Sequence, residues 1–127
     1  MLYSYKEDKI YFDNEKQVMK NKLGIEDQKL LIEVEHKIAM RHMLNLRRRK
    51  VPFVNSSRRL FEIHEQIFSD VYEWAGKVRR VDLSKGETNF LPSSAINNAL
   101  YSIDKKLMNY RVISRWISLN LLKSWLL

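Results

Sequence analysis

Three histidines, His36, His42 and His64, are the side chains of this chain best suited to act as a general base or to bind a metal near neutral pH. His36 and His42 lie six residues apart, so they do not share a helix face closely enough to form a metal-binding pair. His64 falls within a helical pattern and has no visible orienting partner or phosphate cradle nearby. We therefore interpret His36 and His42 as surface residues and His64 as a hydrogen-bonded structural residue.

The composition excludes several other kinds of site. The chain has 127 residues, 45% of them hydrophobic, which predicts one folded domain. Cysteine is absent, so no disulfide or thiolate metal site can form, and a reducing compartment fits. The first eight residues lack the apolar run of a secretory signal, and no stretch approaches the roughly 20 apolar residues of a membrane span. We predict a cytoplasmic protein without a transmembrane segment.

Positive charge is the next feature, with a net charge of +8. Most of the excess lies in two runs, Arg47-Arg48-Arg49-Lys50 and Lys77-Val78-Arg79-Arg80. The simpler interpretation is two solvated basic clusters at the ends of helices or strands. The alternative is a basic helical interaction module that binds nucleic acid or an acidic protein partner. Nucleic acid is not favoured, because no stacking aromatics interleave with the first run and no zinc-finger spacing accompanies it.

The elements that would position these residues are mostly helices. Residues 1–25 show weak periodicity and are interpreted as an irregular arm, with a break at Gly24. A helix is predicted from Glu26, with Asp27 as its N-cap, to the basic run that ends at Lys50, and Pro52 stops it. Apolar residues recur along it at helical spacing and predict its buried stripe: Leu30, Leu31, Val34, Ile38 and Met43.

A second helix is predicted to open near Asn55-Ser56-Ser57 and to end before Gly76, which we assign as its C′ residue. Its expected buried stripe comprises Leu60, Ile63, Ile67, Phe68 and Val71, with Tyr72 and Trp74 in core packing beside it. Alternation at Val78, Val81 and Leu83, a turn at 85–87 and a return strand at 88–91 predict a hairpin. A third helix starts near Pro92 and buries Ile96, Leu100, Ile103 and Leu107.

Three segments form a recognisable combination. The first is Asn21-Lys22-Leu23-Gly24-Ile25, the second runs from Phe61 to Gly76 and contains Asp70-Val71-Tyr72-Glu73-Trp74-Ala75-Gly76, and the third is Val81 to Pro92. In this order they resemble Fic (Fic/Doc) domains, a family that transfers AMP from ATP onto protein hydroxyls. The resemblance runs from about Asn21 to Met108. It implies a mainly α fold, an incomplete Fic-like helical domain with one short β-hairpin flap. We expect an N-terminal arm at 1–25, the partial Fic-like domain at 26–108 and a divergent apolar tail at 109–127.

The flap is the functional candidate that the resemblance implies. In the family, the exposed strand edge of the flap pairs with an extended segment of the protein target. The alternative is an ordinary surface hairpin. The expected target-docking flap comprises Asp82, Leu83, Ser84, Lys85, Gly86, Glu87, Thr88, Asn89 and Phe90.

The catalytic signature of the family does not occur in the chain. That signature is His-Pro-Phe, an acidic residue, then Gly-Asn-Gly-Arg, and none of the three histidines here precedes Pro-Phe. In the family, the histidine is the general base, the glycine-rich backbone holds phosphates, and the acidic residue holds a divalent metal. Complete members therefore use ATP and magnesium, whereas we expect no cofactor, no metal and no catalytic residue here. We interpret the chain as truncated before the signature and inactive in AMP transfer.

The tail departs from the family pattern, because residues 110–127 contain no acidic residue and are markedly apolar. One explanation is a frameshift that replaced the remaining reading frame. A second is an amphipathic core helix, and a third is a basic segment that lies on a membrane surface. An uncovered apolar tail would favour self-association. In the second explanation, the apolar face of the core helix would comprise Ile113, Trp116, Ile117, Leu121 and Trp125.

Overall fold

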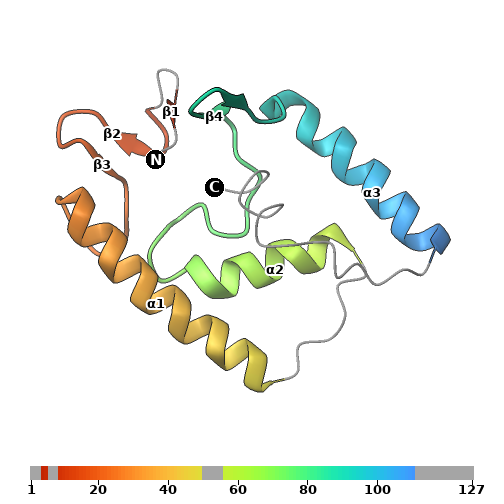
Figure 1. Ribbon diagram of the computed structural model, residues 1–127, viewed down its shortest axis with the longest axis horizontal. Helices are drawn as coiled ribbons and strands as arrows, with labels where there is room; N and C mark the ends of the chain where they lie inside the picture. The colour runs from red at the N-terminus through yellow and green to blue at the C-terminus, as the bar shows by residue number, and fades with distance from the viewer. Residues whose placement is uncertain (1–3, 6–8, 50–55, 111–127) are drawn as a thin grey trace.

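The computed structural model describes residues 4–5, 9–49 and 56–110, and it confirms a mainly α fold with a short β-hairpin (Figure 1). Pro52 and the tail interpretations for residues 111–127 lie outside the described residues. No helix within the described part is long and apolar enough to cross a bilayer. The elements are β1 (Ser4–Tyr5), β2 (Phe12–Asp13), β3 (Val18–Met19), α1 (Gln28–Arg48), α2 (Ser57–Phe68), β4 (Leu83–Lys85), β5 (Thr88–Asn89), the 3-10 turn η1 (Ser93–Ala95) and α3 (Ile96–Tyr110).

Helix α1 begins where its capping residue predicts. The carboxylate of Asp27 accepts the N–H of Lys29 at 3.0 Å, which satisfies one of the unpaired amides of the first turn. Leu31 is fully buried, but Leu30, predicted in the same buried stripe, is 47% exposed. Neighbouring positions on a helix differ by about 100° around its axis, so only one of the two leucines faces the core. The prediction for Leu30 was wrong.

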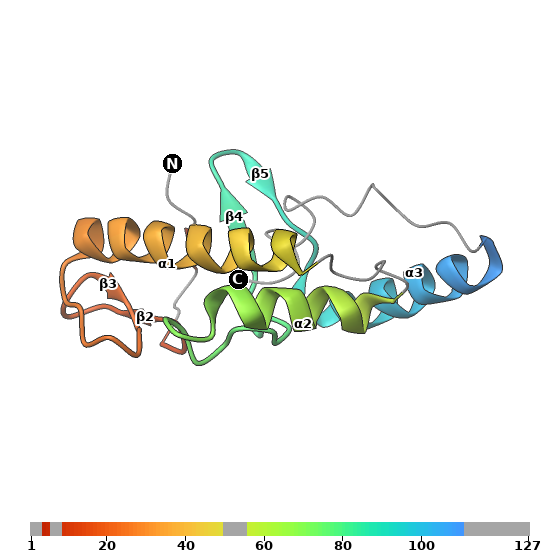
Figure 2. The ribbon, with the colours of Figure 1, turned by 90° about the horizontal axis from the view of Figure 1, so that it is seen from below.

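Helix α2 lies beside α1 (Figure 2). Ser56 is the N-cap, and Leu60 and Ile67 are buried. The helix ends at Phe68, so the prediction that it continues to Gly76 was wrong. Val71 and Tyr72 are buried after the helix has ended, which explains why their spacing mimicked a further turn.

The segment before α1 is more ordered than an irregular arm. Strands β2 and β3 pair antiparallel, with Phe12 opposite Met19 and Asp13 opposite Val18. Tyr11, Val18 and Met19 are buried in one cluster with Leu31, Val71 and Tyr72. The interpretation of residues 1–25 as irregular was wrong in this part, because two-residue strands are too short to show periodicity.

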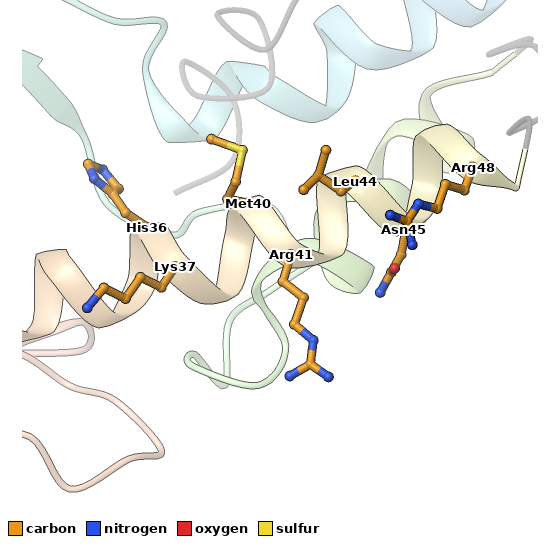
Figure 3. A pocket seen from close by; sticks show the side chains of 7 residues that line it. All are labelled: His36, Lys37, Met40, Arg41, Leu44, Asn45 and Arg48. Carbon is orange, nitrogen blue, oxygen red and sulfur yellow. The ribbon is translucent and has the colours of Figure 1, made fainter.

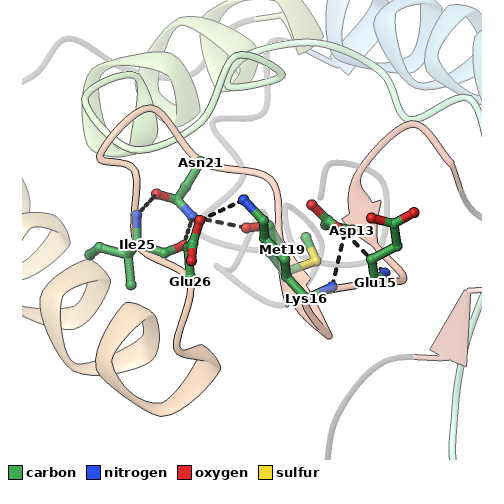
Figure 4. Close-up of polar contacts among 7 residues, drawn as sticks. All are labelled: Asp13, Glu15, Lys16, Met19, Asn21, Ile25 and Glu26. Atoms are coloured by element: carbon green, nitrogen blue, oxygen red, sulfur yellow. Dashed lines mark hydrogen bonds and ion pairs between the residues drawn. The ribbon is translucent and has the colours of Figure 1, made fainter.

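A loop organised by Asn21 joins β3 to α1 (Figure 4). The Asn21 amide group donates to the carbonyl oxygens of Met19 at 2.9 Å and Ile25 at 2.8 Å. Its side-chain oxygen accepts the N–H groups of Leu23 at 3.1 Å and Ile25 at 3.0 Å. Gly24 has a φ of 69°, a left-handed conformation that glycine adopts without steric cost. Segment 21–25 is therefore a structural loop that directs the chain into α1.

The β4–β5 hairpin projects from the helical part of the molecule, and α3 follows it (Figures 1 and 2). The three-stranded sheet has the order β1-β4-β5. Ile96 is fully buried and Leu100 nearly so, which confirms the predicted start of the third helix and part of its stripe. Asp104 of α3 accepts the N–H and the hydroxyl of Ser57, each at 2.7 Å, and so fastens α3 to the start of α2.

Candidate functional site

The hairpin at residues 82–90 is anchored on one side and open to solvent at its tip. Its strands pair antiparallel, with Ser84 opposite Asn89 and Lys85 opposite Thr88. Below these pairs, the N–H of Phe90 donates to the carbonyl oxygen of Leu83 at 3.0 Å. The Leu83 side chain is buried, whereas β5 is exposed at both of its residues. The predicted hairpin is therefore present, with one buried anchor and an exposed second strand.

The guanidinium of Arg79 joins the two sides of the hairpin at its base. One terminal nitrogen donates to the carbonyl oxygen of Val81 at 2.7 Å, and the other donates to the carbonyl oxygen of Leu91. The residue is 2% exposed, and burial lowers the pKa of its guanidinium, an effect that the nearby charge of Asp82 opposes. The two carbonyls and the planar fork of the side chain hold Val81 and Leu91 at a fixed separation.

Arg79 was predicted to be part of a solvated basic cluster, and that prediction was wrong. Lys77 and Arg80 are exposed, as expected of such a cluster. Nothing in the run of charges separates Arg79 from Arg80, because both precede the hairpin and each has a valine on one side and the other arginine on the other side. The direction of each side chain is set by how the chain turns after Gly76.

A second link at the base of the hairpin joins Asp82 to Ser93. One carboxylate oxygen of Asp82 accepts the N–H of Ser93 at 2.8 Å and its hydroxyl at 3.0 Å. The carboxylate thereby satisfies an amide at the start of η1. Together with Arg79, this link fixes both chain segments that enter and leave the hairpin, so the strand edges have a defined direction.

The edge of β4 that faces away from β5 is covered by β1. Strand β1 pairs antiparallel with β4, with Ser4 opposite Ser84 and Tyr5 opposite Leu83. The hairpin was predicted to have an exposed strand edge, and for β4 that edge carries a strand of the same chain. Within the described residues no strand pairs with the outer side of β5.

His64 is buried on α2 and has a structural role. Its Nδ1 accepts the N–H of Gly76 at 2.9 Å, and its side chain is 2% exposed. The imidazole also packs against the rings of Phe68 and Trp74, with centroids 4.8 and 5.9 Å away. Trp74 in turn stacks on Tyr72 at 4.3 Å. The structural interpretation of His64 and the core placement of these aromatic residues are confirmed.

The other two histidines lie on α1. His42 pairs with Asp70 through Nε2 and a carboxylate oxygen 2.7 Å apart, and it links α1 to the chain after α2. No group of three potential metal ligands forms among the described residues. His36 is exposed and borders a shallow depression (Figure 3). All of its described lining side chains come from α1, so among the described residues no second element supplies an opposing group. The depression is lined by His36, Lys37, Met40, Arg41, Leu44, Asn45 and Arg48.

The two basic clusters differ in exposure within the described residues. Arg47, Arg48 and Arg49 are exposed at the end of α1, which suits the negative end of the helix dipole. In the second run, Lys77 to Arg80, the Arg79 side chain is buried. The described structure therefore adds no support for the basic interaction module.

Comparison with known proteins points to one family, although no family model matches the chain. The chain is 37% identical over 97 residues to the protein adenylyltransferase VbhT of Bartonella schoenbuchensis, over 76% of this chain and 20% of that protein. It is 34% identical over 76 residues to a probable protein adenylyltransferase Fic of Salmonella typhimurium, over 58% of this chain and 36% of that protein. The chain thus spans about a third or less of the length of these relatives.

The fold is shared with solved structures. The N-terminal Fic domain of a Bartonella effector protein from Bartonella sp. AR 15-3 superposes with a TM-score of 0.68 at 25% identity. The match covers 78% of this chain and 51% of that one. The predicted resemblance, made from segments 21–25, 61–76 and 81–92, is confirmed by both kinds of comparison.

Proposed function

Because the chain belongs to the Fic-domain (Fic/Doc) family, we propose that it forms the target-docking part of a protein adenylyltransferase domain. In this proposal the hairpin at residues 82–90 receives an extended segment of a target protein by strand addition. The observation that carries the proposal is the fixed base of this hairpin, where Arg79 holds both flanking carbonyls and Asp82 holds Ser93. Backbone pairing sets the register of an added strand only when the receiving edge is itself held in place.

The same chain, by itself, is proposed to be inactive in AMP transfer. Its 127 residues contain no His-Pro-Phe run and no Gly-Asn-Gly-Arg run. Fic-type transfer needs a base to take the proton from the target hydroxyl and backbone amides to hold the nucleotide phosphates. The buried Nδ1 of His64 is already bonded to Gly76, so this residue does not replace the missing base. For the same reason we propose weak or no binding of ATP and magnesium.

An AMP-transfer assay tests the proposed inactivity. The 127-residue chain is incubated with ATP labelled on its α-phosphate, with magnesium or manganese and a cell extract, and we expect no label on any protein that depends on this chain. Calorimetry with ATP should show no binding at micromolar affinity, about −8 kcal/mol. Chain-dependent covalent label, or micromolar binding, would contradict the proposal.

A chimaera tests the docking role. Residues 21–108 of this chain replace the corresponding residues of VbhT, so that the signature comes from the relative. We expect the chimaera to transfer AMP to protein. In a matched control, residues 83–90 are replaced by a glycine-serine linker of equal length, and protein labelling should be lost while the fold, followed by circular dichroism, is retained. A linker chimaera that labels protein as well as the first one would refute the docking role.

A further inference from the structure

We propose that an extended segment of a partner protein docks on the edge of β4 and that β1 of the same chain blocks this edge. Residues 4 and 5 must then dissociate from β4 before a partner pairs there. This inference rests on the proposed docking function of the hairpin, and it states how access of a target segment to the hairpin is regulated. The observation behind it is the pairing of Ser4 with Ser84 and of Tyr5 with Leu83. This pairing shows that the β4 edge accepts an antiparallel strand.

The hydrogen-bond pattern of the hairpin identifies which backbone groups this edge offers. In an antiparallel pair, residues alternate between those bonded to the partner strand and those pointing away from it. The N–H of Phe90 donates to the carbonyl of Leu83, so that pair is bonded within the hairpin. Ser84 is the next residue, and its N–H and carbonyl therefore point to the other side. Its register partner there is Ser4.

The opposite edge of the hairpin offers less to an incoming strand. By the same alternation, Asn89 is the residue of β5 whose backbone groups point outward, because it lies opposite Ser84. The next outward carbonyl along the chain belongs to Leu91, and Arg79 binds it. An added strand at β5 would therefore meet, two residues beyond Asn89, a carbonyl that a side chain of the same protein already binds. The β4 edge is the better docking site, and β1 occupies it.

The occupant is short enough to be displaced. Strand β1 pairs over two residues, whereas the hairpin is also held by Arg79 and by the Asp82–Ser93 link, neither of which involves β1. Loss of β1 should thus expose the β4 edge without unfolding the hairpin. The partner that fits is an extended protein segment in antiparallel register, because backbone pairing is the recognition that this edge provides.

Amide hydrogen exchange on the full chain tests the occupancy. The variant Ser4→Pro removes the N–H that faces Ser84, and Ser4→Ala keeps that N–H as the matched control. We expect the Ser84 amide to exchange roughly 5- to 10-fold faster in Ser4→Pro than in wild type, and unchanged in Ser4→Ala. The Phe90 amide, bonded within the hairpin, should keep its protection in all three proteins and so reports that the hairpin is intact. Equal Ser84 exchange in wild type and Ser4→Pro would overturn the proposal.

A peptide-binding experiment tests the competition. The probe is a synthetic peptide with the sequence of residues 1–8, titrated into wild type and Ser4→Pro and followed by backbone amide shifts. We expect the peptide to bind Ser4→Pro at least about 5-fold more tightly than wild type, with shifts centred on Ser84. Equal affinity for the two proteins, or shifts centred on Asn89, would overturn it.

Failure of this inference is distinguishable from failure of the proposed function. If Ser4→Pro frees Ser84 and gains peptide affinity while the VbhT chimaera labels no protein, the competition at β4 stands and the adenylyltransferase role fails. If the chimaera labels protein while Ser84 exchange is the same in wild type and Ser4→Pro, the docking role stands and the occupancy by β1 fails.

Discussion

The Nδ1 of His64 accepts the backbone N–H of Gly76 at 2.9 Å, and this bond ties the middle of α2 to the chain that returns beside it. Gly76 has a φ of 75°, and a Cβ built there would lie 2.7 Å from the Cβ of Glu65. The return of the chain thus depends on an acceptor at one position and on the absence of a side chain at the other. The chain that leaves this turn leads to β4 at Leu83, so the pair fixes the start of the segment that carries the hairpin.

Replacing His64 tests the acceptor. His64→Phe keeps an aromatic ring but leaves the half-buried N–H of Gly76 without its acceptor, and we expect a loss of about 1–3 kcal/mol in the free energy of unfolding. His64→Asn places a side-chain oxygen near the position of Nδ1 and should lose less. Urea unfolding measures both variants. Equal stability of His64→Phe and wild type would show that the bond contributes nothing.

Adding a methyl group at Gly76 tests the close approach. Gly76→Ala combines a left-handed backbone with contacts to Glu65 Cβ at 2.7 Å and the carbonyl oxygen of Phe61 at 3.0 Å. We expect a loss of about 2–5 kcal/mol. Gly24→Ala is the matched control, because its φ is 69° but no atom lies within 4 Å of the added Cβ, so a loss of about 1–2 kcal/mol is expected there. Thermal unfolding of the two variants should rank them in this order, and a reversed ranking would contradict the packing argument.

Removing Asp104 tests the link between α2 and α3. Its carboxylate accepts two hydrogen bonds from Ser57 at the start of α2, and Ser57 is 8% exposed. We expect Asp104→Ala to lose about 2–4 kcal/mol, because a buried N–H and a hydroxyl lose a charged acceptor. Ser102→Ala on the exposed face of α3 serves as the control and should stay within about 0.5 kcal/mol of wild type. Matching losses in the two variants, measured by urea unfolding, would refute a specific role for Asp104.

Substituting Arg79 tests the base of the hairpin. Arg79→Lys keeps the positive charge, but a single ammonium cannot reproduce the planar fork that reaches both Val81 and Leu91. We expect the Phe90 amide to exchange about tenfold faster, while amides in α1 keep their protection. Arg80→Lys changes the exposed neighbour and should leave Phe90 unchanged. If Arg79→Lys also leaves the Phe90 amide unchanged, the guanidinium is not what holds the hairpin.

The sequence predicted the features that depend on a few neighbouring residues. Asp27 caps α1 because a carboxylate two residues before Lys29 reaches its free amide, and the predicted cap was correct. Leu83, Gly86 and the return strand predicted the hairpin for a similarly local reason. Prediction failed where local spacing allowed two outcomes: Val71 and Tyr72 continue a helical spacing although α2 has already ended at Phe68.

The sequence by itself determined the helical character, the capping residues, the hairpin and the family resemblance, because each is recorded in residue types a few positions apart. The same reading predicts the inactivity in AMP transfer, since the signature run is absent from these 127 residues. Only the tertiary structure decided which of Arg79 and Arg80 is buried, that Asp104 binds Ser57, and that β1 covers β4. These outcomes depend on which segments distant in the sequence come into contact. A charge run or a two-residue strand has no repeating pattern from which its contact partner could be predicted.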